Sequence, residues 1–206
     1  MLTPRVAVLI SGGGTNLQAL IDAQCSGELE PARLTLVVSN RKAAYGLERA
    51  RMAGIETAVL SKYMMPDPVQ NDAALCELLR ARQIDIIALG GFLGILGDAV
   101  LSAYSGRIIN IHPSLIPAFC GMGYYGLRVH EAVLARGVKL TGATAHLVNK
   151  GVDEGPILLQ KAIAVEPDDT PETLQKRVME QCEWILLKQA VRLIAQKIVN
   201  ETERSV

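Results

Sequence analysis

The stretch RIINIHPSLIP, residues 107–117, ends an apolar strand-like run with an amide and an imidazole. Side chains two positions apart on a strand share a face, so Asn110 and His112 project together, with Cα atoms roughly 7 Å apart. Asn donates a hydrogen bond without titrating, and His donates or carries a proton near neutral pH. The pair suits a reaction that develops charge on a carbonyl oxygen. A satisfied histidine at the end of a core strand is the alternative.

A glycine-rich turn, SGGGTN at residues 11–16, follows the first strand-like run. In an α/β fold such a turn lies at the carboxyl edge of the sheet, and the next helix offers unpaired N–H groups to an anion. The turn lacks the Gly-Lys-Ser/Thr of a Walker A loop, and Gly12-x-Gly14-x-x-Leu17 lacks the third glycine of a dinucleotide fingerprint. It therefore predicts a site for a single phosphate, with a plain tight turn as the alternative.

A third candidate is the acid in Asp153-Glu154-Gly155, although turns favour Asp and Gly for purely local reasons. The other histidines, His130 and His146, lie in helix-like and strand-like surroundings, and no spacing among the histidines suggests a metal site. The chain has no GxSxG elbow, which argues against a serine hydrolase.

The segments that must position these residues alternate between strand-like and helical patterns. Strand-like runs cover residues 5–10, 32–40, 55–60, 84–92 and 107–111. Their Val, Ile and Leu content is typical of strands covered on both faces. The rhythm predicts an α/β fold with an open, mostly parallel twisted sheet and helices on both faces. Residues 139–149 and 156–166 predict long antiparallel strands in the C-terminal part, and a last helix is expected from Thr170 to about Asn200.

The composition is that of an ordinary globular protein. With 206 residues, half of them apolar, the chain predicts one domain over residues 1–206. Lys plus Arg and Asp plus Glu both total 21, a balance that argues against binding to nucleic acid or to a membrane surface. The four cysteines form no CxxC pair, and we find no signal peptide or long apolar span. We therefore expect reduced cysteines and a cytoplasmic location.

Several stretches taken together resemble one family. They are LISGGGTNLQALIDA, SNRKAAYGLERARMAGI, LGGFLGIL, INIHPSLIP, GATAHLVNKGVDEGPILLQ and TPETLQKRVMEQCEW. The family is phosphoribosylglycinamide formyltransferase, the folate-dependent glycinamide ribonucleotide transformylase of purine biosynthesis, and the resemblance runs from about residue 5 to 190. It implies a Rossmann-like formyltransferase fold. The Asn-x-His-Pro-Ser and Asp-x-Gly-Pro stretches mark the wider superfamily.

The resemblance implies an activity and roles for residues. The family moves a formyl group from 10-formyltetrahydrofolate to the amine of glycinamide ribonucleotide, two small-molecule substrates, without a metal. Asn110, His112 and Asp153 would be the catalytic set. The residues that would hold the ribonucleotide's phosphate are Gly14, Thr15 and Asn16. The residues that would meet the folate are Leu89, Phe92, Leu93, Gly94, Ile95, Leu96 and Asn110. We expect a monomer or a homodimer.

The chain departs from the family pattern in places. Gly94 stands where many members have a long basic residue, and an Arg usual near Pro68 is missing, so we expect altered contacts with the folate's polyglutamate tail. The family's substrate-binding Glu aligns with Cys182, while Glu183 comes one position later and is carried as the candidate. A shift of one position on a helix is a rotation of about 100°. Glycines in residues 119–126 predict a mobile loop.

Four alternatives stay open. A methionyl-tRNA formyltransferase would carry a basic C-terminal domain, and a formyltetrahydrofolate hydrolase would carry a domain before the first strand; we expect neither here. An NADP-dependent reductase with Arg41 on the 2′-phosphate is disfavoured by the missing third glycine. The last alternative is a catalytically silent protein that binds folate or nucleotide, against which the intact Asn110, His112 and Asp153 argue.

Overall fold

A seven-stranded sheet runs through the protein in the order β3-β2-β1-β4-β5-β6-β7. The computed structural model describes residues 2–204. The strands are β1 (Arg5–Ile10), β2 (Arg33–Ser39), β3 (Glu56–Val59), β4 (Ile86–Leu89), β5 (Ile108–His112), β6 (Leu140–Leu147) and β7 (Ile157–Ala164). Strands β1 to β5 pair in parallel, whereas β6 and β7 are antiparallel. The predicted fold class, including the antiparallel C-terminal strands, is confirmed.

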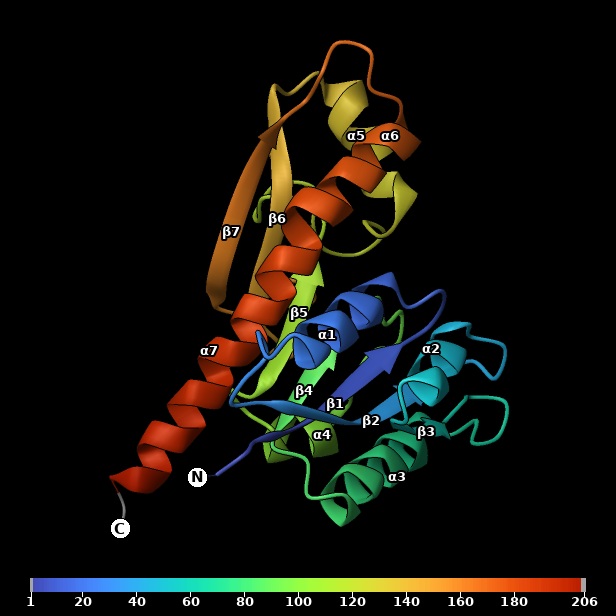
Figure 1. Cartoon of the computed structure of the whole chain (residues 1–206). Helices are drawn as coiled ribbons and strands as arrows, with labels where there is room; N and C mark the ends of the chain where they lie inside the picture. The colour runs from blue at the N-terminus through green and yellow to red at the C-terminus, as the bar shows by residue number, and fades with distance from the viewer. Residues whose placement is uncertain (1, 205–206) are drawn as a thin grey trace.

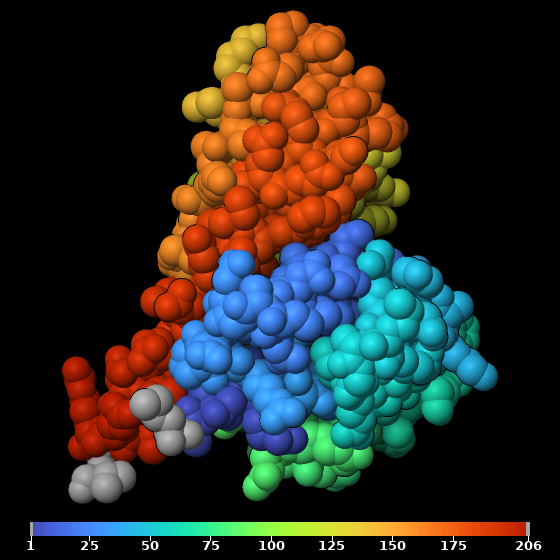
Figure 2. All heavy atoms as spheres, viewed as in Figure 1, coloured from blue at the N-terminus to red at the C-terminus, as the bar shows by residue number. Residues whose placement is uncertain are grey.

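Helices cover both faces of this sheet (Figure 1). One face carries α1 (Thr15–Cys25), α2 (Gly46–Met52) and α7 (Trp184–Glu203), and the other carries α3 (Pro68–Ala81) and α4 (Asp98–Ala103). The remaining helices, α5 (Leu127–Arg136) and α6 (Pro171–Val178), lie beside the far ends of β6 and β7. In the space-filling view these last elements stand above a body built by the N-terminal half, and α7 runs down from one to the other (Figure 2).

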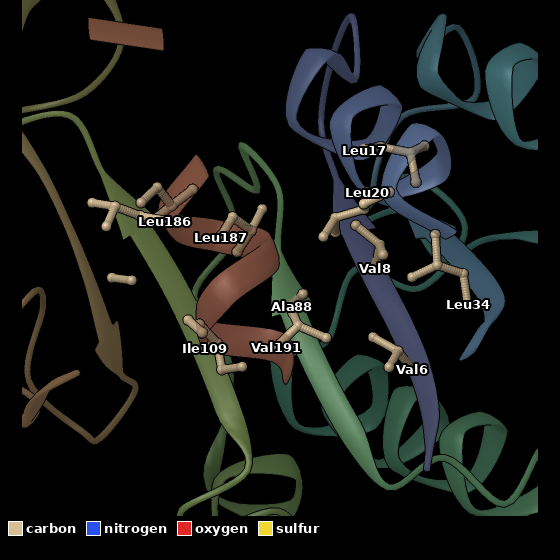
Figure 3. Packing of buried hydrophobic residues seen from close by; sticks show 14 of the residues in the cluster. Val6, Val8, Leu17, Leu20, Leu34, Ala88, Ile109, Leu186, Leu187 and Val191 are labelled. Carbon is tan, nitrogen blue, oxygen red and sulfur yellow. The ribbon is translucent and has the colours of Figure 1, made fainter. Parts of the chain in front are cut away.

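The apolar strands explain why helices lie on both faces. Along β1, Val6 and Val8 belong to the buried cluster under α1 and α7, whereas Ala7 and Leu9 belong to the cluster under α3 and α4. Figure 3 shows the first cluster, in which α1 and α7 lie side by side over the strands. Burying one such aliphatic side chain contributes about 1.5–3 kcal/mol. A strand of this kind is stable only between two layers of helices.

The C-terminal helical run contains an irregular turn. Thr170 caps α6 by accepting a hydrogen bond from Thr173 N–H, and Pro171 is the first helical residue, as the sequence predicts. Between α6 and α7, residues Met179–Glu183 form a π-helical turn, labelled η1. A π turn admits one extra residue into a helix and is frequent at functional sites. Within residues 2–204, no helix is long and apolar enough to cross a bilayer.

The strand order fixes where ligands bind. The chain reverses its direction of strand addition between β1 and β4, which are neighbours with Leu9 opposite Leu89. Leu89 is in turn opposite Asn110 on β5. In open α/β sheets the crevice at such a switch point, at the carboxyl ends of the strands, is the ligand site. The segments that follow β1, β4 and β5 therefore meet at one edge.

Candidate active site

The end of β5 places the predicted pair next to the predicted acid. Asn110 and His112 lie two residues apart on β5, and Asp153 comes from the turn between β6 and β7. Asn110 Nδ2 donates to Asp153 Oδ1 at 3.3 Å, and His112 Nδ1 lies 3.5 Å from Asp153 Oδ2. The backbone of Asp153 lies in the left-handed region, with φ 59°, and this tight turn directs the carboxylate toward Asn110 and His112. Asp tolerates this conformation better than most residues.

A second histidine, His146, joins this cluster. It lies directly opposite Asn110 in the antiparallel β5–β6 register, and the Asn110 Nδ2 to His146 Nε2 distance is 3.1 Å. The other ring nitrogen, Nδ1, is 2.9 Å from the carbonyl oxygen of Leu147. A carbonyl only accepts, so Nδ1 donates to Leu147 O. His146 Nε2 also lies 3.6 Å from Asp153 Oδ1, so His146 packs against both Asn110 and Asp153.

The charges of the cluster depend on burial and on one another. Burial lowers the pKa of His112 below its usual value, while the Phe119 carbonyl and the Asp153 carboxylate act to raise it. Burial acts to raise the pKa of Asp153, but the His146 hydrogen bond and the His112 charge outweigh it, so that pKa is lowered. Asp153 therefore stays ionised at neutral pH and favours a proton on His112.

The glycine-rich loop 119–126 lies against the same residues. His112 Nε2–H donates to Phe119 O at 2.9 Å, and Gly121 N–H donates to Asp153 Oδ2 at 3.0 Å. Phe119 and Gly121 both have positive φ values, of 51° and 87°. The loop thus contributes two backbone groups to the cluster. Its predicted mobility stays a prediction.

A small pocket of about 140 Å³ opens beside the cluster. Its lining includes Leu89, Phe92, Gly94, Ile95, Leu96, Asn110, His146 and Asp153. Most of the residues that the resemblance assigns to the folate therefore share one cavity with the candidate catalytic groups. The exception is Leu93, whose side chain is 54 % exposed and outside the lining, and whose N–H is donated to Ser11.

The glycine turn after β1 is shaped for close backbone approach. Gly14 precedes α1 with φ 71°, and a Cβ there would lie 2.7 Å from Gly46 Cα. No described side chain caps the N-terminus of α1. Thr15 Oγ1 donates to Met179 Sδ at 3.3 Å, and Arg49 Nε donates to Gly13 O at 2.9 Å. The open helix N-terminus and the nearby guanidinium together favour an anion.

Asn16 meets an acid from the other end of the chain. Asn16 Nδ2 donates to Glu183 Oε2 at 2.9 Å. The π turn η1 supplies the extra residue that turns Glu183 toward α1, while Cys182 is fully buried in the core cluster. Burial raises the pKa of Glu183, and the Asn16 amide only partly opposes this. Asn16 Oδ1 is buried without a hydrogen-bond partner among residues 2–204, so it is an open acceptor.

Comparison with known proteins identifies the family. The model of the formyl transferase family matches residues 4–191. The chain belongs to the formyl transferase family. A phosphoribosylglycinamide formyltransferase from Haemophilus influenzae is 40% identical over 86% of this chain and 81% of that protein. The crystal structure of glycinamide ribonucleotide transformylase 1 from Symbiobacterium toebii has a TM-score of 0.88 and 43% identity, covering 95% of this chain and 89% of that one.

Longer relatives contain a region similar to this chain. The trifunctional purine biosynthetic protein adenosine-3 from Bos taurus is 42% identical over 95% of the chain. The chain spans about a fifth of that relative, 19% of its length. The family resemblance that the sequence motifs suggest is confirmed.

One residue of the site, His146, is not predicted from the sequence, although its place opposite Asn110 follows once β5 and β6 are paired. Within residues 2–204, no group of three or more His, Cys, Asp or Glu residues is arranged to hold a metal ion. His130 is fully buried on α5, and burial, together with the charge of His112, lowers its pKa to about 4.

Proposed function

We propose that the chain transfers the formyl group of 10-formyltetrahydrofolate to the amine of phosphoribosylglycinamide. The observation that carries this proposal is the contact of Asn110, His112 and Asp153 beside the small pocket. The identity of about 40% with a phosphoribosylglycinamide formyltransferase over most of both chains supports it.

The residues divide the chemistry among themselves. The substrate amine attacks the formyl carbon, a C–N bond forms, and negative charge develops on the formyl oxygen. Asn110 Nδ2 and protonated His112 stabilise this oxyanion; removing one such donor typically raises the barrier by about 2.7–4 kcal/mol. The bond between the formyl carbon and the folate nitrogen then breaks. The amine's proton reaches that nitrogen through water held by Asp153, which also keeps the proton on His112.

Two sets of residues would hold the substrates. Gly14, Thr15 and Asn16 would meet the phosphate at the open N-terminus of α1, and the Glu183 carboxylate would accept hydrogen bonds from the ribonucleotide. The pterin would enter the small pocket, where Leu89, Phe92 and Leu96 supply apolar walls and Gly94 and Ile95 supply backbone groups. Leu93 would contribute only its carbonyl, since its N–H is used.

We further propose that the reaction needs no metal and that the chain works in the cytoplasm as one domain, monomeric or homodimeric, without nucleic acid. The balance of 21 basic and 21 acidic residues supports a small-molecule enzyme. Activity that survives EDTA would test whether the reaction needs a metal. A mass from light scattering would test the oligomeric state.

Formyl transfer by the purified protein tests the main proposal. Glycinamide ribonucleotide and 10-formyl-dideazafolate are mixed with the enzyme, and absorbance reports release of the deformylated folate. We expect turnover by the wild type and a loss of several orders of magnitude in His112→Ala. Release of formate without ribonucleotide would indicate a hydrolase instead, and tight folate binding with no turnover would indicate a binding protein.

A further inference from the structure

The segment after β4 forms one wall of the small pocket without belonging to any helix or strand. Residues 90–97 are irregular, and Gly91 has φ 79°. Among the described residues, the N–H groups of Gly94, Ile95 and Leu96 have no hydrogen-bond partner. A segment with free backbone donors presents them to a ligand only if other contacts fix the path of its backbone. Hydrogen bonds at the two ends of the segment fix that path.

Ser11 holds the first end. Leu93 N–H donates to Ser11 Oγ at 2.8 Å, and Ser11 is 2 % exposed. Ser11 is the first residue of the glycine turn after β1, the strand that pairs with β4. Its hydroxyl joins the segment that would meet the folate to the turn that would meet the phosphate.

Asp72 holds the second end of the segment. It belongs to α3, which covers the face of the sheet opposite to α1. Asp72 Oδ1 accepts from Gly97 N–H at 2.7 Å, and Oδ2 accepts from Ala99 N–H at 2.8 Å and from Val100 N–H at 3.3 Å. A Cβ on Gly97 would lie 2.6 Å from Asp72 Oδ2, so only glycine permits this approach. One carboxylate therefore fixes both the end of the segment and the start of α4.

We propose that Asp72 and Ser11 are positioning residues that set the path of residues 93–97 for folate binding. The inference rests on the proposed function and deepens it, because neither side chain lines the pocket. Hydrogen bonds to a charged acceptor are stronger than those to a neutral one. Asp72→Asn keeps one oxygen but turns an amide N–H₂ toward backbone N–H groups. We expect it to raise the KM for folate about tenfold to a hundredfold.

The test measures both substrates in matched variants. Asp72→Asn is paired with Asp67→Asn, which removes the charge of the N-cap residue that accepts from Val69 N–H on the same helix. Ser11→Ala is paired with Ser39→Ala, which removes a buried hydroxyl bonded to Arg41 at the end of the neighbouring β2. The measurements are kcat, both KM values, the Kd of 10-formyl-dideazafolate by titration, and the Tm.

We expect Asp72→Asn to weaken folate binding with the KM for ribonucleotide and kcat within twofold of wild type. Ser11→Ala should weaken folate binding about threefold to tenfold, and neither control should change it. Equal loss for both substrates, or an unchanged folate Kd, would overturn the proposal. If Asp72→Asn does not fold, the Ser11 pair decides alone. Failure of the wild type to bind folate would instead refute the proposed function.

Discussion

Replacing Asp153 by Asn isolates the effect of the negative charge that lies beside His112. Asn is close in shape, and like Asp it tolerates the left-handed backbone that this position requires, at φ 59°. Its oxygen can still accept the hydrogen bond from Gly121 N–H, which holds the loop. The substitution therefore removes the negative charge 3.5 Å from His112 Nδ1 with little change of shape.

The size of the effect follows from that distance. Two unit charges about 4 Å apart interact by about 4 kcal/mol at an effective dielectric constant near 20. Solvent at the pocket mouth screens part of this, and carboxylate–cation pairs shift a pKa by about 1–3 units. The pKa of His112 is already lowered by burial, and losing Asp153 lowers it further. At pH 7 we expect about 10-fold to 1000-fold less imidazolium, and a matching fall in kcat.

The assay is the pH dependence of kcat in wild type, Asp153→Asn and the neighbouring control Glu154→Gln, whose carboxyl is exposed. The alkaline limb of the variant should move to lower pH, so the loss shrinks as the medium is acidified. NMR titration of the His112 ring should show the same shift. A profile with the wild-type shape, reduced equally at every pH, would refute the role of Asp153 as the partner of His112.

Three further predictions concern neighbouring parts of the site. Asn110→Ala should lower kcat about 10²-fold to 10³-fold with little change in either KM, measured at steady state. Gly14→Ala should lower the free energy of unfolding by more than about 1 kcal/mol and raise the KM for ribonucleotide, because φ is 71° and Gly46 leaves no room for a Cβ. Gly12→Ala is the control and should change neither quantity, because a Cβ on Gly12 would lie in open space. Glu183→Gln should weaken ribonucleotide binding. The raised pKa of Glu183 means that its stabilising effect is present at low pH and is lost as pH rises through that pKa, so the variant's Tm should exceed wild type at pH 8 and match it near pH 4.

Local pattern predicts the strands well because they are apolar runs between turns. The first strand is predicted at residues 5–10 and observed as Arg5–Ile10. The fourth is predicted at 84–92 but ends at Leu89, because Gly91, with φ 79°, turns the chain away from the sheet. The residues after Gly91 therefore leave the sheet and line the pocket.

Contacts between distant residues are what the sequence could not predict. Helix α4 has six residues and no apolar pattern, and Asp72, 25 positions before Gly97, fixes its start. Glu183 reaches Asn16 across 167 positions through a π turn that no periodicity indicates. Asn110 and His112 could be predicted as site residues because a buried strand rarely ends in polar groups that have no partner or function.

The π turn also decides which side chains of the last helical run meet α1. An added residue in an ordinary helix would rotate all later side chains by about 100°. Here Leu174 and Val178 before η1 and Leu186 and Leu187 after it all reach the same core cluster, so the irregular turn keeps the apolar face of the run continuous. Within the turn, Cys182 stays in that cluster while Glu183 contacts Asn16, so two adjacent residues serve the core and the start of α1 at once.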